Sequence, residues 1–410
     1  MSAIDVETHD VVIVGAGPAG LATARGLVAA GIQDVVVLDR EDEAGGVPRH
    51  CGHTGFGLRE FGRLMSGPAF ARRSAAAATG ATIRTAVTVS ALEPGGRLRL
   101  ATPDGPQQIV GRRVLLAMGV RETPRAPRLI SGTRPWGVTT TGALQQLVYL
   151  AGLRPFSRAV IVGSELVSFS TLLTMRSGRI NPVAMIEENA RITARRPGDL
   201  IARYLFCVPV LTETKLVAIE GGSHITGVVV ESRGVRRQIE CDGVVFTGGF
   251  RPESALLESS HLISDPCTGG PLADQYGRCS DPAYFATGNL IHPVETAGRC
   301  YRDGLRCAKA IIADLSARLP TPQSRVRVST AGALRYLCPA LVSFPDDTFG
   351  SWSFNARASH ELRGRLSVVA DGTEVWSRRL HVLPERRLTI PSREFSGRAP
   401  RSITVALYGA

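Results

Sequence analysis

The sequence predicts an α/β protein built from a duplicated strand–helix–strand unit, followed by a smaller all-β region toward the C-terminal end. The run VVIVGAGPAG, which leads to VVVLD, is repeated as AVIVGSELVS, which leads to VAMIE, with corresponding positions 148 residues apart. Beyond about residue 325, apolar and polar residues alternate in short segments separated by turns. Because the two copies agree in both a glycine turn and a later acidic residue, they indicate duplication rather than chance.

The first copy has the order of elements expected of a dinucleotide-binding unit. Residues 11–14 are predicted to form a buried strand and residues 21–30 a helix, which ends at Gly31 because glycine is favoured there. Residues 35–38 form the second strand. Amides at the helix start, with the positive end of the helix dipole, stabilise phosphates. The alternative is a glycine-rich turn in another kind of α/β protein.

Each landmark residue of this first copy has an expected role. Gly15 permits a tight turn, Gly17 lets the backbone approach a pyrophosphate, and Gly20 lets the helix pack close to the strand. Asp39 follows the second strand and is placed to bind a ribose diol. These residues predict a functional nucleotide site.

The second copy is altered at the position that faces the pyrophosphate. Gly163 is retained, but Glu165 replaces the second glycine, Ser168 replaces the third, and Glu187 corresponds to Asp39. A carboxylate ~4 Å from a phosphate, at an effective dielectric of ~20, costs about 4 kcal/mol, or roughly a thousandfold in affinity. The carboxylate can instead occupy the helix N-terminus itself. We expect this unit to keep its fold and to bind NAD(P) weakly or not at all; the alternative is a shifted loop that still admits the cofactor.

The remaining segments extend this pattern. A long excursion follows Gly45, and a linker is expected at residues 320–322. Strands are expected near residues 82–90, 97–101, 114–118, 241–249 and 284–289, and helices over residues 142–152 and 296–315. The alternating segments after residue 325 predict at least five strands, arranged as a small sandwich with a packing, interface or lid role.

Composition narrows the class of protein. The net charge is +12, but the basic residues are spread along the chain and aromatic residues make up only 6%. Nucleic-acid binding is therefore not expected; a solvated basic surface is, with docking of an acidic partner or an anionic substrate as the alternative. We find no apolar run long enough to span a bilayer and no N-terminal signal pattern, so we expect a cytoplasmic protein.

The eight cysteines form no CxxC or CxC pair, which argues against zinc, a redox dithiol or an iron–sulfur cluster. His50, Cys51 and His53 lie in the segment HisCysGlyHis, which offers too few nearby ligands for a metal. We therefore predict no metal site.

Several motifs taken together are similar to those of the pyridine nucleotide-disulphide oxidoreductase-like flavoproteins. They are GAGPAG, AspArg at 39–40, GlyGly at 45–46, LeuLeuAlaMetGly at 115–119, ThrGlyGlyPheArgPro at 247–252 and AlaThrGlyAsn at 286–289. The resemblance covers roughly residues 1–318. Within this group, the segment GlyGlyValProArgHisCysGlyHis and the weak second copy look most like the α-type subunits of heteromeric amine and imino-acid dehydrogenases, such as opine oxidase, hydroxyproline dehydrogenase and hydrogen cyanide synthase.

The resemblance implies two Rossmann-like domains, the second inserted in the first. FAD would bind a discontinuous domain of residues 1–125 and 244–318, residues 126–243 would form an NAD(P)-binding-like domain, and residues 325–410 the β appendix. Further FAD contacts are implied at Pro18, Ala19, Arg40, Gly46, Arg49, Ala117, Gly119, Gly288, Asn289 and Thr296. Three departures matter. Only Cys51 follows the GlyGly pair, so dithiol chemistry is unsupported; the β appendix stands where some α-type subunits have a cysteine-rich iron–sulfur tail; and Asn289 replaces an acid that meets the ribityl chain.

The same resemblance places the segment 49–53 beside the flavin ring. His50 or His53 suits proton transfer because histidine titrates near neutrality, and Arg49 supplies positive charge. Cys51 can be a redox centre only as a thiolate beside a histidinium. His292 is expected as a flavin neighbour. The alternatives are loop histidines hydrogen-bonded to backbone or FAD, and a buried apolar cysteine.

Three functions remain open at this point. The first is an FAD-dependent oxidoreductase that acts on a small molecule and exchanges electrons with a partner subunit or an external acceptor. The second is a self-sufficient NAD(P)H-dependent flavin reductase. The third is a scaffold subunit in which FAD is only structural.

Overall fold

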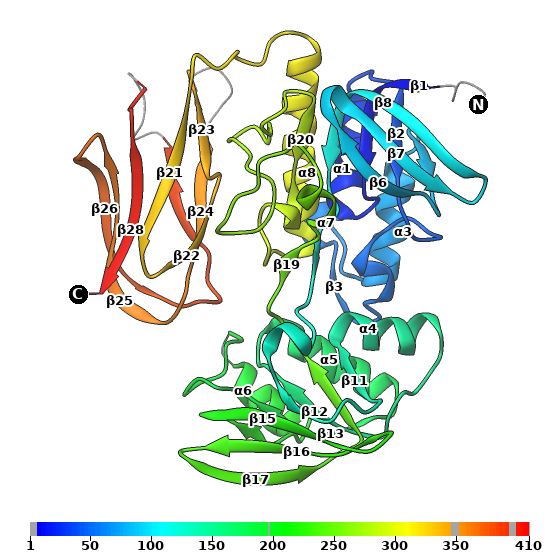
Figure 1. Cartoon of the computed structure of the whole chain (residues 1–410), viewed down its shortest axis with the longest axis vertical. Coiled ribbons are helices and arrows are strands. Elements are labelled where there is room, and N and C mark those ends of the chain that lie inside the picture. Colours follow the sequence, from blue (N-terminus) through cyan, green and yellow to red (C-terminus); the bar gives the residue numbers. More distant parts are fainter. Residues whose placement is uncertain (1–5, 196, 346–351, 393–398, 410) are drawn as a thin grey trace.

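The computed structural model of the chain describes residues 6–195, 197–345, 352–392 and 399–409. The chain forms three parts, two of α/β architecture and one all-β (Figure 1). In Figure 1 the first part is blue, cyan and yellow, the second is green and lies below it, and the third is orange to red and lies to one side.

The first part is built on a sheet in which β1 (Glu7–Val14) is central. β2 (Val35–Leu38) and β8 (Gly105–Leu116) both pair with it in parallel. β5 (Thr82–Arg84) pairs with β2, and β20 (Tyr284–Ala286) pairs with β8, again in parallel. The order β5–β2–β1–β8–β20 is that of a Rossmann sheet. The predicted strands at 11–14 and 35–38 and the predicted step at 284–289 are confirmed.

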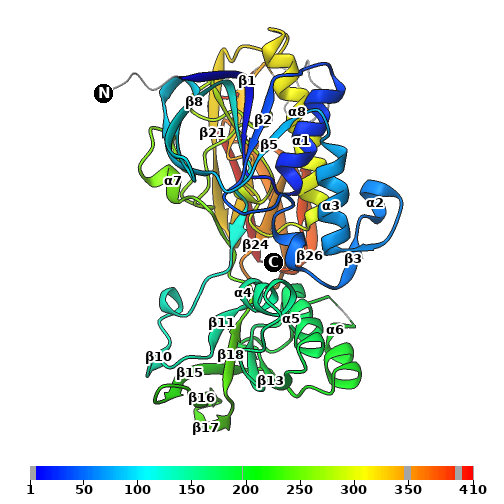
Figure 2. The same ribbon diagram turned by 90° about the vertical axis from the view of Figure 1, so that its right-hand side faces the viewer.

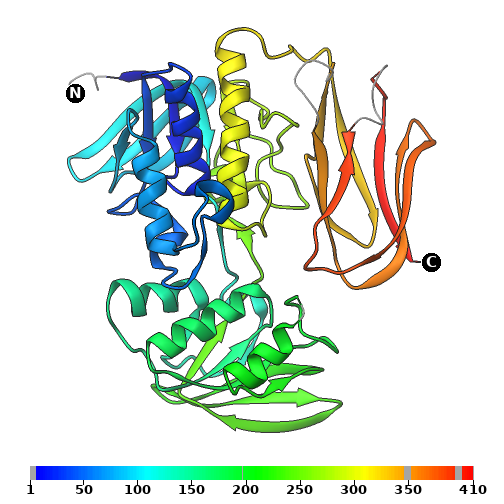
Figure 3. The same ribbon diagram turned by 180° about the vertical axis from the view of Figure 1, so that it is seen from behind.

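Helices cover one face of this sheet. α1 (Pro18–Ala29) and α8 (Ala297–Leu315) lie side by side, as seen from behind in Figure 3. The hydroxyl of Thr23 donates to the carbonyl of Gly304 across this contact, at 3.0 Å. Buried apolar residues of both helices and of β1 form a single core, which fixes the start of α1 against the end of β1.

One predicted strand is divided in the structure. Residues 82–90 give β5 and then β6 (Thr88–Glu93), because Ala86 adopts a φ of 54° and breaks the extended backbone. β6 pairs antiparallel with β7 (Arg97–Thr102), which pairs antiparallel with β8. The excursion after Gly45 contains η1 (Val47–His50), β3 (Thr54–Phe56), α2 (Leu58–Phe61), β4 (Met65–Ser66) and α3 (Gly67–Ala77). The short helix η2 (Pro94–Gly96) joins β6 to β7, and α7 (Ala255–Glu258) and η6 (Gly288–Leu290) precede and follow β20.

The second part repeats the parallel architecture. Its five-stranded sheet has the order β11–β18–β12–β13–β14, and every pair is parallel. These strands are β11 (Val138–Thr140), β18 (Gly243–Phe246), β12 (Arg158–Val162), β13 (Asn181–Ile186) and β14 (Val210–Leu211). Figure 2 shows helices on one side of this sheet and a second, smaller sheet on the other.

Two further groups of elements complete the second part. The helical side holds α4 (Thr141–Gln145), the π-helix η4 (Gln146–Leu150), α5 (Leu166–Ser177), α6 (Gly198–Leu200) and the π-helix η5 (Ile201–Leu205). The other side holds η3 (Ala126–Arg128), β10 (Ser131–Gly132), β15 (Thr214–Gly221), β16 (Ile225–Ser232) and β17 (Val235–Glu240). Each side has its own apolar core.

The second part is inserted into the first. The chain leaves the first sheet after β8 and returns to it only with β20. The outgoing and returning segments pair as β9 (Val120–Arg121) and β19 (Arg251–Pro252). Two adjacent extended segments therefore connect the two parts (Figure 1).

The third part is a β-sandwich. A five-stranded sheet of order β23–β21–β28–β25–β26 faces a three-stranded sheet of order β22–β24–β27 across one apolar core. The strands are β21 (Ser324–Gly332), β22 (Leu334–Cys338), β23 (Leu341–Phe344), β24 (Ser353–Ala358), β25 (Leu362–Ala370), β26 (Thr373–Val382), β27 (Leu388–Pro391) and β28 (Ile403–Gly409). The predicted sandwich is confirmed. Within the part of the chain that the structure describes, no helix combines the length and apolarity needed to cross a bilayer.

Candidate functional site

The first glycine loop has the geometry that its sequence predicts. Gly15 adopts a φ of +105°, and a Cβ atom there would lie 2.6 Å from the carbonyl oxygen of Ala117. A Cβ atom on Gly20 would collide with the carbonyl oxygen of Gly15. Gly17 differs, because nothing lies within 4 Å of a Cβ built on it. The loop is thus closely packed at Gly15 and Gly20 and open at Gly17, which is where a pyrophosphate needs to approach.

The start of α1 is open to an anion. Gly17 is its N-cap residue, and among the described residues no side chain caps the helix or places an acid in its first turn. The carboxylate of Asp39 accepts from the amides of Ala16 (2.6 Å) and Glu41 (2.9 Å). A carboxylate has about four acceptor positions, so Asp39 retains capacity for a ribose hydroxyl.

Two other segments converge on this loop. Gly45 donates its amide to the carbonyl of Ala16 at 2.8 Å. A Cβ atom on Gly46 would lie 2.8 Å from Cα of Gly17, and one on Gly288 would lie 2.8 Å from Cβ of Ala19. The structure therefore brings together motifs that lie more than 200 residues apart in the sequence.

The arginines near this loop are already compensated. Arg49 is largely buried and lies 3.8 Å from Glu41 and 3.4 Å from Glu43. Arg40 is exposed and lies 3.9 Å from Glu41. The positive charge expected of Arg49 is thus balanced within the loop.

Asn289 and Thr296 hold the entrance to α8. The side chain of Asn289 accepts from the amide of Glu295 at 2.9 Å and donates to its carbonyl at 3.0 Å. Thr296 caps α8 by accepting from the amide of Arg299 at 3.4 Å. Asn289 therefore shapes the loop before α8 and keeps one N–H for another partner. Gly119 has a φ of +76° and nothing within 4 Å of a Cβ.

The second glycine loop is filled by its own side chain. Gly163 has a φ of +117°, and a Cβ atom there would lie 2.7 Å from Oε2 of Glu165. The Glu165 carboxylate lies 2.8 Å from the hydroxyl of Thr247 and 3.4 Å from that of Ser168, and it abuts Gly248. Glu165 is the N-cap residue of α5, yet its side chain accepts no amide there. The carboxylate thus lies over the glycines rather than at the helix amides, contrary to the sequence-based alternative.

Glu187 lacks the spare hydrogen-bonding capacity that Asp39 retains. It is 6% exposed. It accepts hydrogen bonds from the hydroxyls of Ser164 and Thr193 and from both the backbone and the side-chain nitrogen of Asn189. Four donors use the acceptor capacity of a carboxylate. The amides of Thr193 and Ala194 also bond to Ser164, which holds this segment across the loop.

Burial controls the chemistry of the segment after Gly46. Burial, with a smaller effect of the Arg49 charge, lowers the pKa of His50 to about 4, so its imidazole is neutral. Burial raises the pKa of the Cys51 thiol to about 12, a shift that its bond to Gln145 only partly opposes. The condition for a reactive thiolate, a histidinium beside a low-pKa cysteine, is therefore not met. Nε2 of His50 is buried and has no partner among the described residues.

His53 has a defined tautomer. Its Nδ1 lies 2.9 Å from the carbonyl oxygen of Thr54, and a carbonyl only accepts, so Nδ1 carries the proton. In the neutral imidazole Nε2 is therefore an acceptor, and this atom is buried without a partner among the described residues.

The second part of the molecule closes over this segment, which the sequence did not predict. The Cys51 thiol lies 3.4 Å from Oε1 of Gln145 on α4, and a Cβ on Gly52 would collide with the Tyr149 ring. Glu122 accepts from the amides of Gly142 (2.8 Å) and Gly248 (3.2 Å), and burial raises its pKa. No local sequence signal marks Gln145 or Glu122, because their role arises from the packing of two domains.

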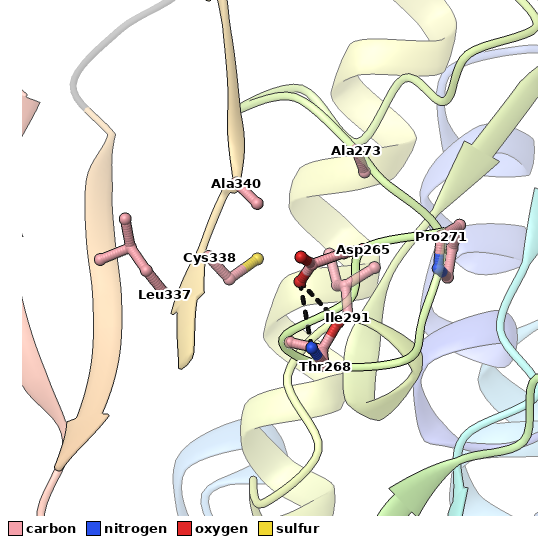
Figure 4. Close-up of a pocket in the computed structure, with 8 residues that line it drawn as sticks. All are labelled: Asp265, Thr268, Pro271, Ala273, Ile291, Leu337, Cys338 and Ala340. Carbon is pink, nitrogen blue, oxygen red and sulfur yellow. Dashed lines mark hydrogen bonds between the residues drawn. The ribbon is translucent and has the colours of Figure 1, made fainter. Parts of the chain in front are cut away.

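The backbone of His292 lies beside the candidate site, since its amide donates to the carbonyl of Gly288 at 3.0 Å, but its imidazole faces the sandwich. It is buried, its Nε2 is 3.3 Å from the thiol of Cys338 in the sandwich, and burial lowers its pKa. Cys338 also borders a cavity of about 10 Å³, room for one water at most, which Asp265 and Ile291 line from the opposite side (Figure 4). The imidazole of His292 thus faces the third part of the molecule, and its place beside a flavin stays a prediction.

No group of three or more His, Cys, Asp or Glu side chains suited to a metal ion occurs in the described ranges. HisCysGlyHis therefore forms no such group there.

Comparison with known proteins agrees with this architecture. A family model described as pyridine nucleotide-disulphide oxidoreductase matches residues 9–304. The opine oxidase A chain of Rhizobium meliloti (strain 1021) is 32% identical over 162 residues, which is 38% of this chain and 33% of that protein. The sarcosine oxidase alpha chain of Corynebacterium sp. (strain P-1) is 27% identical over 270 residues, covering 60% of this chain and 27% of that protein.

Solved structures share the fold. The thioredoxin reductase of T. acidophilum superposes with a TM-score of 0.62 at 23% identity, covering 75% of this chain and 99% of that one. The match to each of the two curated relatives spans about a third of that protein's length or less. With its two Rossmann-like sheets, glycine loops and matched residues, the chain belongs to the pyridine nucleotide-disulphide oxidoreductase family.

Proposed function

We propose that the chain is an FAD-dependent oxidoreductase that holds FAD at its first glycine loop and does not use NAD(P) at its second. The observation that carries the proposal is the contrast between the two loops. The first has open space above Gly17 and an acid with spare capacity, Asp39. The second has the Glu165 carboxylate over its glycines and a saturated Glu187.

The residues of the first loop fit FAD. In this proposal Gly15, Gly17, Pro18, Ala19 and Gly20 hold the pyrophosphate, and Asp39 holds the ribose. Gly46, Ala117, Gly119, Gly288, Asn289 and Thr296 line the remainder. FAD, when bound, supplies an acceptor or donor of a hydride. The FAD-binding domain comprises residues 1–125 and 244–318, with residues 126–243 as the inserted domain and 325–410 as the β domain.

We assign proton handling to His50 and His53. Both have a buried Nε2 without a partner among the described residues. His53 presents an acceptor there, because Nδ1 is protonated. A neutral imidazole can take the proton of a substrate N–H or O–H group as a hydride leaves the adjacent carbon. Because a pKa of about 4 makes His50 a weak base, we assign proton acceptance chiefly to His53 and hydrogen bonding to His50. Cys51 takes no part as a nucleophile in this proposal.

Electrons then leave the chain by a route other than NAD(P). Two relatives are named as subunits of larger enzymes, one of an opine oxidase and the other of a sarcosine oxidase. We therefore propose that a partner subunit or an external acceptor exchanges electrons with this chain, and that its substrate is a small molecule.

Anaerobic mixing of the flavin-loaded chain with NADH tests this proposal. We expect the flavin band at about 450 nm to persist, since that absorbance belongs to the oxidised cofactor. Glu165→Gly should gain NADH binding, and Glu165→Gln, which removes charge but keeps bulk, should gain less. Both gains in NADH binding should stay modest, because the acceptor positions of Glu187 remain occupied by neighbouring donors. Rapid bleaching of the unmodified chain would show instead that it is a self-sufficient NADH-dependent reductase.

A further inference from the structure

The β-sandwich contains a cavity of about 370 Å³ beside its edge strand β26. The floor of the cavity is apolar and includes Leu366, Trp376, Leu380 and Leu388. Leu366 and Leu388 belong to the buried core of the sandwich, and Trp376 and Leu380 pack against that core only partly buried. The cavity is therefore an open extension of the sandwich core.

The sheet arrangement explains the opening. β26 is the edge strand of the five-stranded sheet, whereas the facing sheet has only three strands. On β26 Trp376, Arg378 and Leu380 share one face because side chains alternate along a strand. In the register of the sheet, Arg378 stands opposite Leu366, which is 1% exposed. The wider sheet thus overhangs the narrower one and leaves part of its inner face uncovered.

The ionisable side chains among the described lining residues are all basic. Arg378, Arg386, Arg387 and His381 line the cavity, and none of the described residues that line it is acidic. Arg387 is paired with Glu295, and His381 with Glu361. Arg378 and Arg386 are exposed and form no ion pair with any residue in the described ranges. An arginine on the inner face of a sandwich is unusual, since inner faces are mainly apolar.

We propose that this cavity binds a small amphipathic anion, a carboxylate or sulfonate with an aromatic or aliphatic body. The apolar body lies on Trp376 and Leu380, and the anionic group lies between Arg378 and Arg386. Guanidinium groups favour such oxygens because they donate paired hydrogen bonds. The volume falls in the range of small-molecule pockets, about 300–1,000 Å³. This proposal is independent of the cofactor and of the reaction.

The test uses the full chain, loaded with FAD, and two probes, anilinonaphthalene sulfonate and decanoate. We expect the fluorescent sulfonate to bind, to quench Trp376, and to be displaced by decanoate. Arg378→Ala combined with Arg386→Ala should weaken binding at least about tenfold. Arg379→Ala is the matched control, because Arg379 lies on the opposite face of the same strand and does not line the cavity.

Three results would overturn the proposal. Equal binding of the neutral analogue decanol would show a merely apolar groove, and equal weakening by Arg379→Ala would show unspecific attraction to a basic surface. Quenching that survives Trp376→Phe would place the probe elsewhere on the molecule. Reduction of the flavin by NADH, or a failure of the chain to bind flavin, would contradict the proposed function but not the anion site in the sandwich.

Discussion

At the scale of single residues, burial decides what the segment after Gly46 can do. Cys51 and His50 are both buried, so the thiol of the first stays protonated and the imidazole of the second stays neutral. Neutral groups of this kind favour hydrogen bonding over nucleophilic attack. The contrast with the exposed Cys207 and Cys267 makes this testable.

Cys51 should be dispensable for chemistry. We expect Cys51→Ser to keep turnover within about twofold, because a thiol with a pKa of about 12 supplies almost no thiolate at pH 8. Timed alkylation with iodoacetamide, followed by mass spectrometry, should label Cys207 and Cys267 first and Cys51 last. Early labelling of Cys51, or loss of turnover in Cys51→Ser with flavin retained, would restore it as a reactive centre.

His50 should make stability depend on pH. Its pKa is about 4 in the folded chain against 6.5 when unfolded, so the unfolded state binds more protons between these values. Folded stability is then fully present above pH 6.5 and falls as pH drops toward 4, by up to about 3 kcal/mol.

Denaturant unfolding of the unmodified chain and of His50→Gln across pH 4–7 measures this dependence. The variant lacks the titrating group, so its loss of stability over that interval should be smaller. Identical slopes for the two proteins would contradict the assignment.

At the scale of elements, the turn between β1 and α1 combines a tight side with an open side. Gly20 meets the carbonyl of Gly15, whereas Gly17 meets nothing. The two glycines therefore serve different ends, packing for Gly20 and access for Gly17. A pair of alanine substitutions separates these roles.

Gly20→Ala should destabilise the fold by about 3 kcal/mol or more, because the methyl group forces α1 away from β1. Gly17→Ala should leave unfolding of the FAD-free chain nearly unchanged, since its φ of −80° suits alanine and its surroundings are empty. It should weaken FAD retention by at least about tenfold, by blocking the pyrophosphate.

Calorimetry of the FAD-free chains and flavin fluorescence on dilution give the two readouts. Full FAD retention by Gly17→Ala would count against a pyrophosphate at this loop, and so against the cofactor site as a whole.

At the scale of the whole molecule, Glu295 connects the first part to the β domain. It is almost fully buried immediately before α8, and it pairs with Arg387 and Arg357. Arg357 also donates to the carbonyls of Val294 and Glu385. The entrance to α8, which also holds Asn289, is therefore fixed by side chains from a different part of the chain.

Glu295→Gln should cost about 3 kcal/mol or more, because it leaves Arg357 buried without a counter-charge. Glu374→Gln is the matched control: its pair with Arg365 is exposed and screened by solvent, so its loss should leave the midpoint of thermal unfolding nearly unchanged. The midpoints of thermal unfolding compare the two. Equal midpoints would mean that the Glu295 pairs add nothing to the attachment of the β domain.

Much of this architecture follows from local sequence. Gly15, Gly20, the strands around them and the alternation after residue 325 predict the Rossmann units and the sandwich, because periodicity and backbone sterics act over short distances. The single residue Glu165 likewise predicts, from the sequence, that the second loop admits a pyrophosphate poorly. These features need no knowledge of distant contacts.

Other features depend on how the parts pack. The sequence aligns Glu187 with Asp39, but only the packed segment through Thr193 shows that its acceptor positions are occupied. The burial of the His292 imidazole against Cys338 likewise depends on the sandwich. Neither the contact of Gln145 with Cys51 nor the overhang beside Trp376 has a local signal. The sequence alone determined the elements and the two loops, whereas burial, protonation and access were decided by tertiary structure, since they depend on neighbours distant in the chain.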